Sequence, residues 1–524
     1  MKRKILLICK ESFSFPFYFL AKDLLSKNND VASYFFNSIE TGYDECKMNT
    51  NTYFAHKKLK NLNVYDNNEI LELFSKNLER PPIDYEFIEI IRKNYTKDKV
   101  LSLQILTSQF FSKYFHDRFF FDEVTYEQQI YWLELNYRRV IEIFEDFKPD
   151  IIWDLDNAEL SRSIISEIAQ SRGIPYIIID HPRFGMYKIP SYSAICKNDY
   201  FVSLFHKNKK LDPEILKNEY SYINEFRSRD KIMSKVFEND ITSNYKRTPL
   251  LGMMKFIISK IFYLINISFK GKNISFRSKN HIIFPSNLKF LWFFIKATLK
   301  RWYLLGPNKY FSNPISGEKY VYMPLHLIPE SSTSVLSPFY LNELASIEQV
   351  SKSLPLGWYL YVKEHQSMLG ERSINFYKNA NKLPNVKMIS VNYYTDPKPI
   401  IQNAIGVITV TGSAAYEAAL LGKKAIVFGD VHFNLIDGIT RLKSYEELPI
   451  VISNFDSNDS FDNIHSSAAY IATVKNLGEE INLKYLMSEG EKILMGLVKI
   501  SPLYKKEINK LECFFDSALI NLNK

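Results

Sequence analysis

The sequence predicts an α/β protein with two domains, each built on a sheet of parallel strands. Two observations carry this prediction. Short apolar runs alternate with helix-like stretches over residues 4–179, and the same alternation returns over residues 320–428. Such runs are typical of strands that helices cover on both faces. A length of 524 residues suits two to four domains.

The first half opens as a strand, a helix and a second strand, and this pattern recurs after an irregular, aromatic-rich section. Thr125-Tyr-Glu-Gln128 matches a capping box, and Lys148-Pro149 ends the helix that it starts. The elements expected in order are strand Lys4–Cys9, helix Phe15–Leu25, strand Val31–Phe36, a helix through Phe147, strand Asp150–Trp153, helix Ser161–Gln170 and strand Tyr176–Ile179.

The second series begins at residue 320 and closes with three tightly spaced elements. A Thr411-Gly412-Ser413 turn separates the last helix from the strand before it, and Gly422 is expected to end that helix. The elements expected in order are strand Tyr320–Pro324, helix Leu341–Ser353, strand Trp358–Lys363, helix Ser373–Lys382, strand Val386–Ile389, strand Ile405–Val410, helix Ala414–Leu421 and strand Ala425–Phe428.

Composition narrows the class of protein. Hydrophobic residues make up 46% and charged residues 24%, which argues against wholesale disorder and against a polytopic membrane protein. The four cysteines are far apart and show no metal-ligand spacing, so a reducing, cytoplasmic setting fits. The N-terminal apolar run, Ile5–Cys9, is too short for a signal peptide, and no run of about 18 apolar residues predicts a spanning helix.

The positive charge is concentrated in one region. Residues 246–310 hold 13 Lys and Arg and no Asp or Glu, although the net charge of the whole chain is +9. The same region contains two strongly apolar stretches, 250–269 and 288–305. On a helix, Lys289, Lys296 and Lys300 share one face, opposite an apolar face formed by Leu291, Trp292, Ile295, Leu299 and Trp302.

This pattern is typical of a helix that lies on an anionic membrane surface. An amphipathic helix packed on its own domain is the ordinary alternative. Nucleic acid is not expected as a partner, because the region lacks a nucleic-acid-binding motif and its aromatic residues do not alternate with its lysines.

Polar residues gather where strands of the second domain end. His326, His365 and the Thr411-Gly412-Ser413 turn each follow a different predicted strand, and the carboxyl ends of parallel strands share one edge. The turn opens a helix, so its free N–H groups suit a phosphate, with Lys363 as a further cation. Glu417, one turn into that helix, is placed to accept hydrogen bonds from ribose hydroxyls. Taken alone, the turn is also an ordinary helix start.

The first domain supplies carboxylates at the corresponding strand ends. Asp154 and Asp156 follow strand Asp150–Trp153, and Asp180 follows strand Tyr176–Ile179. Carboxylates at such positions serve as a general base or a nucleophile. Asp154 and Asp156 could also bind a metal or cap the following helix, and no metal requirement is predicted.

Five motifs follow one another in the second domain, over about residues 319–435. They are Met323-Pro-Leu-His-Leu-Ile-Pro-Glu330, Tyr361-Val-Lys-Glu-His365, Leu383-Pro-Asn-Val386, Thr411-Gly-Ser-Ala-Ala-Tyr-Glu-Ala418 and Gly422-Lys-Lys-Ala-Ile-Val-Phe-Gly429. In order and spacing, these motifs resemble the bacterial capsule polysaccharide biosynthesis family, which includes Kdo transferases.

The resemblance implies a GT-B fold, with two Rossmann-like domains facing a cleft, and a CMP-activated 2-keto sugar acid (Kdo or a sialic-like sugar) as donor, with no obligatory cofactor. It carries over donor-site candidates, namely His326, Glu330, Lys363, His365, Thr411, Gly412, Ser413 and Glu417. The chain departs from the family pattern at His365-Gln366, where His-Pro is expected, and at His181-Pro-Arg183, where a glycine-containing acidic turn is expected. The second departure leaves the stereochemistry and the acceptor open.

We therefore expect a glycosyltransferase that extends a capsule or lipopolysaccharide glycan, with Asp180, Asp156 and Asp154 as catalytic candidates. The acceptor would be lipid-linked or an oligosaccharide, and the enzyme would be cytoplasmic and peripheral on the inner face of the cell membrane. A nucleotide-sugar epimerase or hydrolase of the same fold and a non-catalytic subunit of capsule assembly are the alternatives. The expected parts are an acceptor domain (1–240), a basic connector (241–310), a donor domain (311–480) and C-terminal helices (481–524).

Overall fold

The computed structural model describes residues 2–35, 52–96, 101–106, 125–157, 160–195, 198–233, 246–269, 287–328, 330–456 and 461–522. The predicted boundary between residues 240 and 241 lies outside these ranges. The strands are β1 (Lys4–Cys9), β2 (Asp30–Phe35), β3 (Leu62–Asp66), β4 (Ile151–Asp154), β5 (Tyr176–Asp180), β6 (Tyr187–Ser191), β7 (Lys319–Pro324), β8 (Trp358–Lys363), β9 (Val386–Ile389), β10 (Gly406–Thr409), β11 (Lys424–Val427), β12 (Ile439–Arg441) and β13 (Glu479–Glu480).

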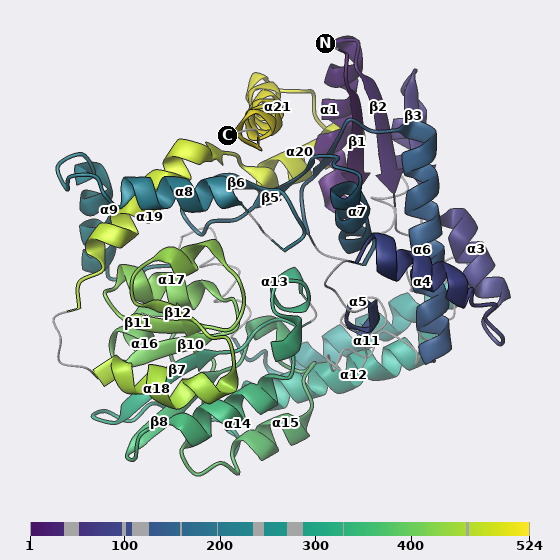
Figure 1. Ribbon diagram of the computed structural model, residues 1–524. Coiled ribbons are helices and arrows are strands. Elements are labelled where there is room, and N and C mark those ends of the chain that lie inside the picture. The colour runs from purple at the N-terminus through teal and green to yellow at the C-terminus, as the bar shows by residue number, and fades with distance from the viewer. Residues whose placement is uncertain are drawn as a thin grey trace.

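The helices connect and cover these strands (Figure 1). They are α1 (Ser14–Ser26), α3 (Asn68–Lys76), α4 (Tyr85–Asn94), α5 (Leu101–Leu106), α6 (Tyr126–Phe147), α7 (Leu160–Ser171), α8 (Asp199–Asn208), α9 (Lys217–Ser228), α11 (Leu250–Phe269), α12 (Asn287–Leu304), α13 (Ser331–Ser334), α14 (Glu343–Ser353), α15 (Ile374–Ala380), α16 (Lys398–Gln402), α17 (Ser413–Leu420), α18 (Leu448–Ser453), α19 (Ile464–Leu477), α20 (Leu483–Leu494) and α21 (Pro502–Leu522).

The first domain is a seven-stranded sheet in the order β13-β6-β5-β4-β1-β2-β3. Side chains of β1 alternate between two cores, because successive residues of a strand point to opposite faces. Leu6 and Ile8 pack with α6 and α7, whereas Ile5 and Leu7 pack with α1 and α21. The capping box at Thr125 is present, and α6 ends before Lys148, whose φ of 53° is left-handed. Because α20 and α21 pack in the same core as Ile5 and Leu7 of β1, the C-terminal helices belong to the first domain.

One edge of this sheet departs from the predicted parallel order. β6 pairs antiparallel with β5, and β13 pairs antiparallel with β6. The short connection of residues 181–186 reverses the chain, so β6 returns beside β5 without a crossover helix. β13 reaches this edge from a distant part of the sequence, directly before the C-terminal helices.

The second domain is a six-stranded sheet in the order β12-β11-β10-β7-β8-β9, with parallel pairing throughout. α14, α15 and α18 cover one face, and α16, α17 and α19 cover the other. Gly422 ends α17 with a φ of 76°, as expected. The predicted α/β class, with two domains each built on a mainly parallel sheet, is confirmed.

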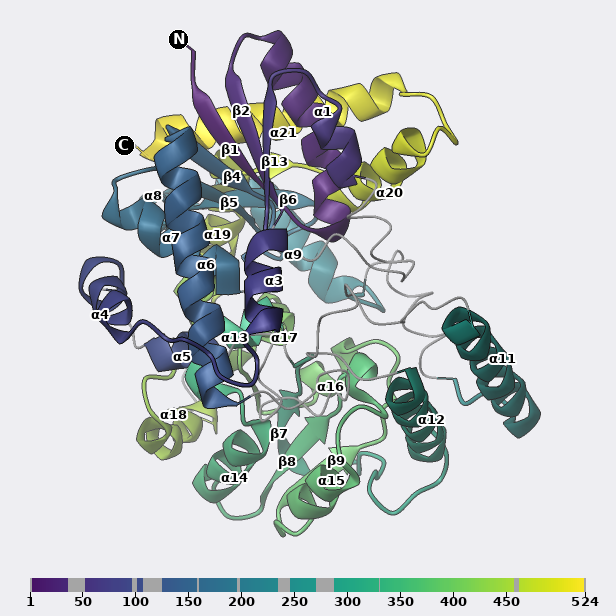
Figure 2. The ribbon, with the colours of Figure 1, turned by 90° about the vertical axis from the view of Figure 1, so that its right-hand side faces the viewer.

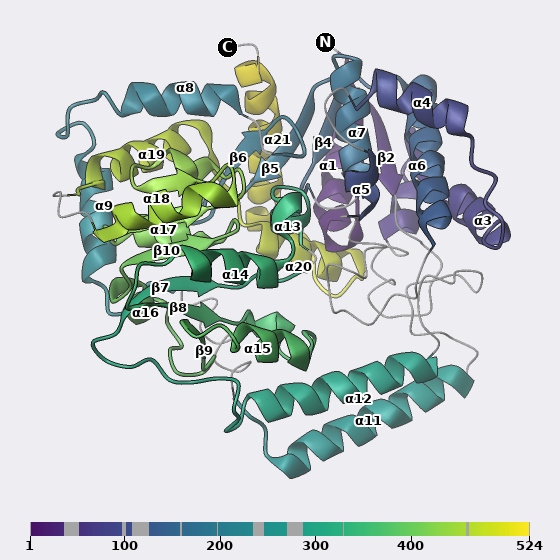
Figure 3. The same cartoon turned by 60° about the horizontal axis from the view of Figure 1, so that its bottom comes forward.

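The two domains share a core on the α19 side. α8 and α9 precede the connector in sequence but pack on α19, and their Phe201, Phe205 and Ile223 belong to the same apolar cluster as Ala415 of α17. Figure 1 shows α8 and α9 beside α19, and Figure 3 shows α11 and α12 as a separate pair at the side of the second domain. These contacts hold the carboxyl ends of the two sheets toward each other.

Candidate functional site

The candidate site lies at the carboxyl ends of β7, β8 and β10, which are neighbours in the second sheet. Each strand delivers its polar residue to the same rim, as the sequence predicts. The backbone N–H of Thr411 donates to Nε2 of His326 over 3.3 Å, which joins the ends of β7 and β10 directly. The charge of Glu330, which follows β7, acts on His365, which follows β8.

His326 holds the turn in place rather than facing outward. Its Nδ1 lies 3.0 Å from Oε1 of Glu343, and its Nε2 lies 3.1 Å from the hydroxyl of Thr409. The proton therefore belongs on Nδ1, which donates to the carboxylate, while Nε2 accepts from Thr411 and Thr409. The side chain of His326 is 7% exposed. His326 is thus a positioning residue, and the expected direct contact with a ligand does not fit its geometry.

A buried ion cluster supports both histidines. The guanidinium of Arg372 donates to Glu343 over 2.7 Å and to Glu364 over 2.8 Å. Glu364 in turn accepts the backbone N–H of His365 over 2.7 Å. Burial raises the pKa of Glu343, but Arg372 and His326 outweigh it and hold the pKa below its ordinary value. Sequence reasoning missed Arg372 and Glu343, because they carry no motif and only the folded chain brings both to the histidines.

His365 presents a hydrogen-bond donor to the rim. Its Nδ1 accepts the N–H of Ser367 over 3.2 Å, so the ring proton belongs on Nε2. Burial lowers the pKa of His365, which keeps the ring neutral near pH 7. Glu330 stands nearby with an exposed side chain that accepts from Ser332 over 2.7 Å. These two side chains are suited to touch a ligand.

The turn before α17 is built for close approach. A Cβ at Gly412 would lie 2.6 Å from the hydroxyl of Thr409, so no larger residue fits there. The hydroxyl of Thr411 donates to the carbonyl of Ser332 over 2.8 Å and is used inside the protein. Within the ranges that the structure describes, no side chain caps α17, so the N–H groups of Ser413 and Ala414 at the positive end of the helix have no capping acceptor there. This arrangement suits an anion.

Glu417 and Lys363 lie on the α16 side of the rim. Ser413 donates to Glu417 over 3.0 Å, and burial raises the pKa of Glu417. The ammonium of Lys363 donates to the carbonyl of Tyr394 over 2.7 Å, and burial lowers its pKa to about 8. Lys363 is therefore engaged by the loop after β9, whereas Glu417 stands beside the turn.

In the first domain, Asp154 has a structural role. Its carboxylate is 0% exposed and accepts two N–H groups of Arg162, at 2.8 and 2.9 Å, and the hydroxyl of Tyr176 at 2.8 Å. No face of this carboxylate is left for a substrate, so the expected catalytic role does not fit Asp154. Asp156 is partly exposed, but Arg162 also donates to it over 2.9 Å.

Asp180 lies where the two domains meet. Nε2 of His432, from the segment after β11, is 2.8 Å from Oδ2 of Asp180, close but not aligned as a hydrogen bond. The N–H of His181 donates to the other carboxylate oxygen over 2.6 Å. Arg183 is exposed and has a left-handed φ of 65°; burial raises the pKa of Glu417, and the charge of Arg183 only partly opposes that rise. Sequence reasoning did not single out His432 or Arg183 as candidates.

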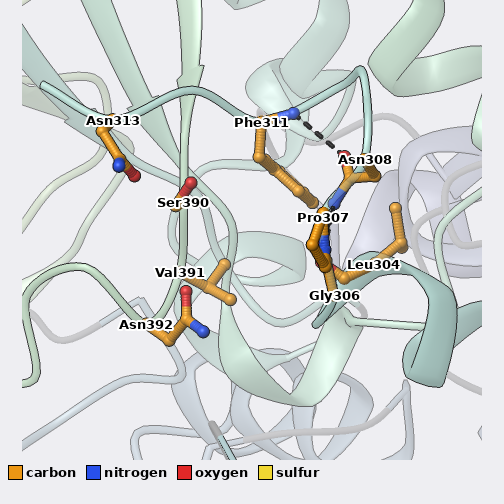
Figure 4. A pocket seen from close by; sticks show the side chains of 9 residues that line it. All are labelled: Leu304, Gly306, Pro307, Asn308, Phe311, Asn313, Ser390, Val391 and Asn392. Carbon is orange, nitrogen blue, oxygen red and sulfur yellow. Dashed lines mark hydrogen bonds between the residues drawn. The ribbon is translucent and has the colours of Figure 1, made fainter. Parts of the chain in front are cut away.

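A pocket of about 260 Å³ lies at the far edge of the same rim, beside the end of β9 (Figure 4). It is lined by Leu304, Gly306, Pro307, Asn308, Phe311, Asn313, Ser390, Val391 and Asn392. The pocket lies beside the edge strand β9, and its lining does not include His326 or His365. Over the described ranges of the chain, His, Cys, Asp and Glu form no group suited to a metal ion.

No protein-family model and no curated protein sequence matches the chain. Solved structures with a similar fold include KpsC of Thermosulfurimonas dismutans, a beta Kdo 2,7 transferase, at 12% identity and a TM-score of 0.33, covering 64% of this chain and 79% of that one. The beta Kdo 2,4 transferase of the same KpsC has 13% identity and a TM-score of 0.28, covering 66% and 93%.

A UDP-GlcNAc 2-epimerase of Methanocaldococcus jannaschii, in complex with UDP-GlcNAc and UDP, is also similar. It has 10% identity and a TM-score of 0.27, covering 91% of this chain and 99% of that one. The similar structures thus include both transferases and epimerases, so the function is inferred from the residues of the site.

Proposed function

We propose that the chain is a glycosyltransferase that takes its sugar from a nucleotide-activated donor. One observation carries this proposal: the uncapped start of α17, the Nε2–H of His365 and the Glu417 carboxylate gather on one rim, and Asp180 of the other domain lies 2.8 Å from His432, which follows the neighbouring strand β11. Donors for a phosphate, an acceptor for ribose hydroxyls and a carboxylate for the reacting centre are the parts that glycosyl transfer from a nucleotide sugar requires.

The donor in this proposal is a CMP-activated 2-keto sugar acid, Kdo or a sialic-like sugar. The support is the resemblance of the five motifs between residues 319 and 435 to the capsule polysaccharide family. The CMP phosphate accepts hydrogen bonds from the N–H groups of Ser413 and Ala414 and from His365. Glu417 binds the ribose. These donors stabilise the departing CMP, so no metal is obligatory.

Asp180 is the carboxylate that serves the reacting centre. The acceptor hydroxyl gives its proton to Asp180 while its oxygen bonds to the anomeric carbon, and the bond from that carbon to the CMP phosphate oxygen breaks. CMP leaves with the electron pair. The imidazole of His432, whose Nε2 lies 2.8 Å from Oδ2, is placed to orient this carboxylate. Asp156 takes a supporting role, because Arg162 already engages it.

The acceptor is a growing capsule or lipopolysaccharide glycan, either lipid-linked or an oligosaccharide. A lipid-linked acceptor would place the enzyme in the cytoplasm at the inner face of the cell membrane. Nucleic acid is not a partner in this proposal.

Thermal unfolding with CMP, UDP and GDP tests the donor site, since a ligand that binds only the folded protein raises its stability. We expect CMP to raise the melting temperature and His365→Ala to abolish that rise. His206→Ala, which removes an exposed histidine of α8, should leave it intact. A shift with UDP alone would refute the CMP donor.

Product analysis with a CMP-Kdo donor and an oligosaccharide acceptor tests the reaction. We expect the wild type to form a glycosylated acceptor and Asp180→Asn to form none. Asp230→Asn is the control, because Asp230 is an exposed residue after α9, and this variant should still form the product. Free sugar or an epimer as the sole product would favour the hydrolase or epimerase alternative. No turnover together with CMP binding would favour a non-catalytic subunit.

A further inference from the structure

The helices α11 and α12 form a pair that stands at the side of the second domain. α12 lies between α11 and the domain, as Figures 2 and 3 both show. Arg301 of α12 donates to the carbonyl of Gln366 over 2.9 Å, and Lys300 donates to the carbonyl of Arg372 over 2.7 Å. The ion cluster beneath the donor site is therefore linked to α12, and α11 is the outer helix.

One apolar stripe of α11 is used to hold the pair together. Met253 and Leu264 are buried, and Phe256 contacts Phe294 of α12 with ring centroids 5.5 Å apart. At the N-terminal end of α11, Arg247 stacks on Trp302 at 3.6 Å. The packing of α11 on α12 therefore accounts for one side of the outer helix.

A second apolar stripe of α11 is exposed. Its members follow one another at spacings of three or four residues, so they form one helical face. They are Leu251, Met254, Ile258, Phe262, Ile265 and Phe269, with exposed fractions of 73, 48, 47, 68, 44 and 89%. Monomeric soluble proteins seldom expose a continuous apolar face of this kind, and where one occurs it marks a binding surface.

α12 has a shorter exposed apolar stripe. Its lysines do not all face outward, although the sequence predicts that they do. Leu288, Trp292, Leu299 and Tyr303 are exposed at the same helical spacing. Lys300, expected to face a membrane, instead bonds to backbone carbonyls of the second domain, and the side chain of Lys289 lies outside what the structure describes. Lys296 is exposed, so of the three lysines it is the one that the structure leaves at the expected outward position.

The positive charge of α11 and α12 indicates which kind of partner binds the two exposed stripes. The described parts of this region, 246–269 and 287–310, hold nine Lys and Arg and no acidic residue, so α11 and α12 carry a strong positive charge. A second copy of the chain would bring two such regions together, and their like charges would oppose a symmetric contact. An anionic lipid surface instead offers acyl chains to the apolar side chains and negative headgroups to Lys246 and Lys255, both on exposed residues.

We infer that the exposed stripes of α11 and α12 form a docking face that inserts into the surface of an anionic bilayer without crossing it. Among the described helices, none combines the length and apolarity that a bilayer span needs. The inference does not depend on glycosyl transfer, because lipid binding is measured without donor or acceptor.

Flotation with phosphatidylglycerol-containing vesicles tests the inference. We expect the protein to float with these vesicles at low salt and with phosphatidylcholine vesicles far less. Ile258→Gln with Phe262→Gln should reduce binding by at least tenfold, since burial of one such side chain is worth about a factor of ten. Lys246→Glu with Lys255→Glu should reduce it by a similar factor.

Matched controls carry the same changes elsewhere on the surface. Ile215→Gln with Leu356→Gln, at 64 and 103% exposure, and Lys93→Glu with Lys382→Glu should bind as the wild type does. Unchanged CMP stabilisation and melting temperature would show that the variants are folded. No flotation of the wild type, equal binding to neutral vesicles, or a stable dimer that Ile258→Gln with Phe262→Gln dissociates would overturn the inference.

Discussion

Replacement of His326 by alanine tests whether this residue holds the turn before α17 in place or contacts the ligand itself. The imidazole links Glu343, Thr409 and Thr411 in one buried group. His326→Ala leaves the N–H of Thr411 and the hydroxyl of Thr409 without their acceptor, whereas Glu343 keeps Arg372 and the backbone N–H of position 326. It also opens a small cavity behind the turn.

The expected loss follows from these contacts. A buried polar group without a partner costs about 1 to 3 kcal/mol. Two such groups, with part of the cost relieved by rearrangement, give a local destabilisation of about 3 kcal/mol. His365→Ala serves as the comparison, because His365 is half-buried and its ring accepts a single N–H, from Ser367. We expect less than about 1 kcal/mol for that variant.

Hydrogen exchange of the amides of Thr411 and Gly412 measures the local effect, because both amides donate inside this group. His326→Ala should speed their exchange by roughly 100-fold, since each 1.4 kcal/mol corresponds to a factor of ten. His365→Ala should leave the exchange nearly unchanged but abolish stabilisation by CMP. Unchanged exchange in His326→Ala, with loss of CMP binding, would refute the positioning role.

Three further predictions concern buried charges of both domains. Asp154→Asn should lower the free energy of unfolding in urea by about 3 to 5 kcal/mol, because it removes the main partner of buried Arg162, whereas a change below about 1 kcal/mol would contradict the buried pair. Burial lowers the pKa of Lys363 to about 8, so the wild type should gain stability as the pH rises from about 8 to 10.5, and Lys363→Met should lose this gain; parallel pH profiles would contradict the assignment. Glu417→Gln should weaken CMP binding in calorimetry about tenfold by removing a charged acceptor for ribose hydroxyls, and unchanged affinity would exclude that contact.

The strand and helix order of the second domain could be predicted closely from sequence. Alternating apolar runs and the Gly422 helix end are local signals, so β7 to β11 and α17 were expected within a few residues. Because the pattern implies parallel strands, it also predicts that His326, His365 and Thr411 meet at one rim. The structure brings these residues together.

The roles of individual side chains could not be predicted in this way. The burial of Asp154 depends on Arg162, whose direction only the folded helix α7 fixes. The contact of His432 with Asp180 joins segments from different domains. The orientation of Lys300 likewise depends on how α12 packs against the second domain. Each is a tertiary contact that has no signature in the local sequence.

A structure of the complex with CMP tests the central claim most directly. The account predicts that the phosphate lies within hydrogen-bonding distance of the N–H groups of Ser413 and Ala414 and of Nε2 of His365, with the ribose at Glu417. A nucleotide bound instead in the pocket beside Asn308 and Asn392, or with its phosphate away from α17, would contradict it.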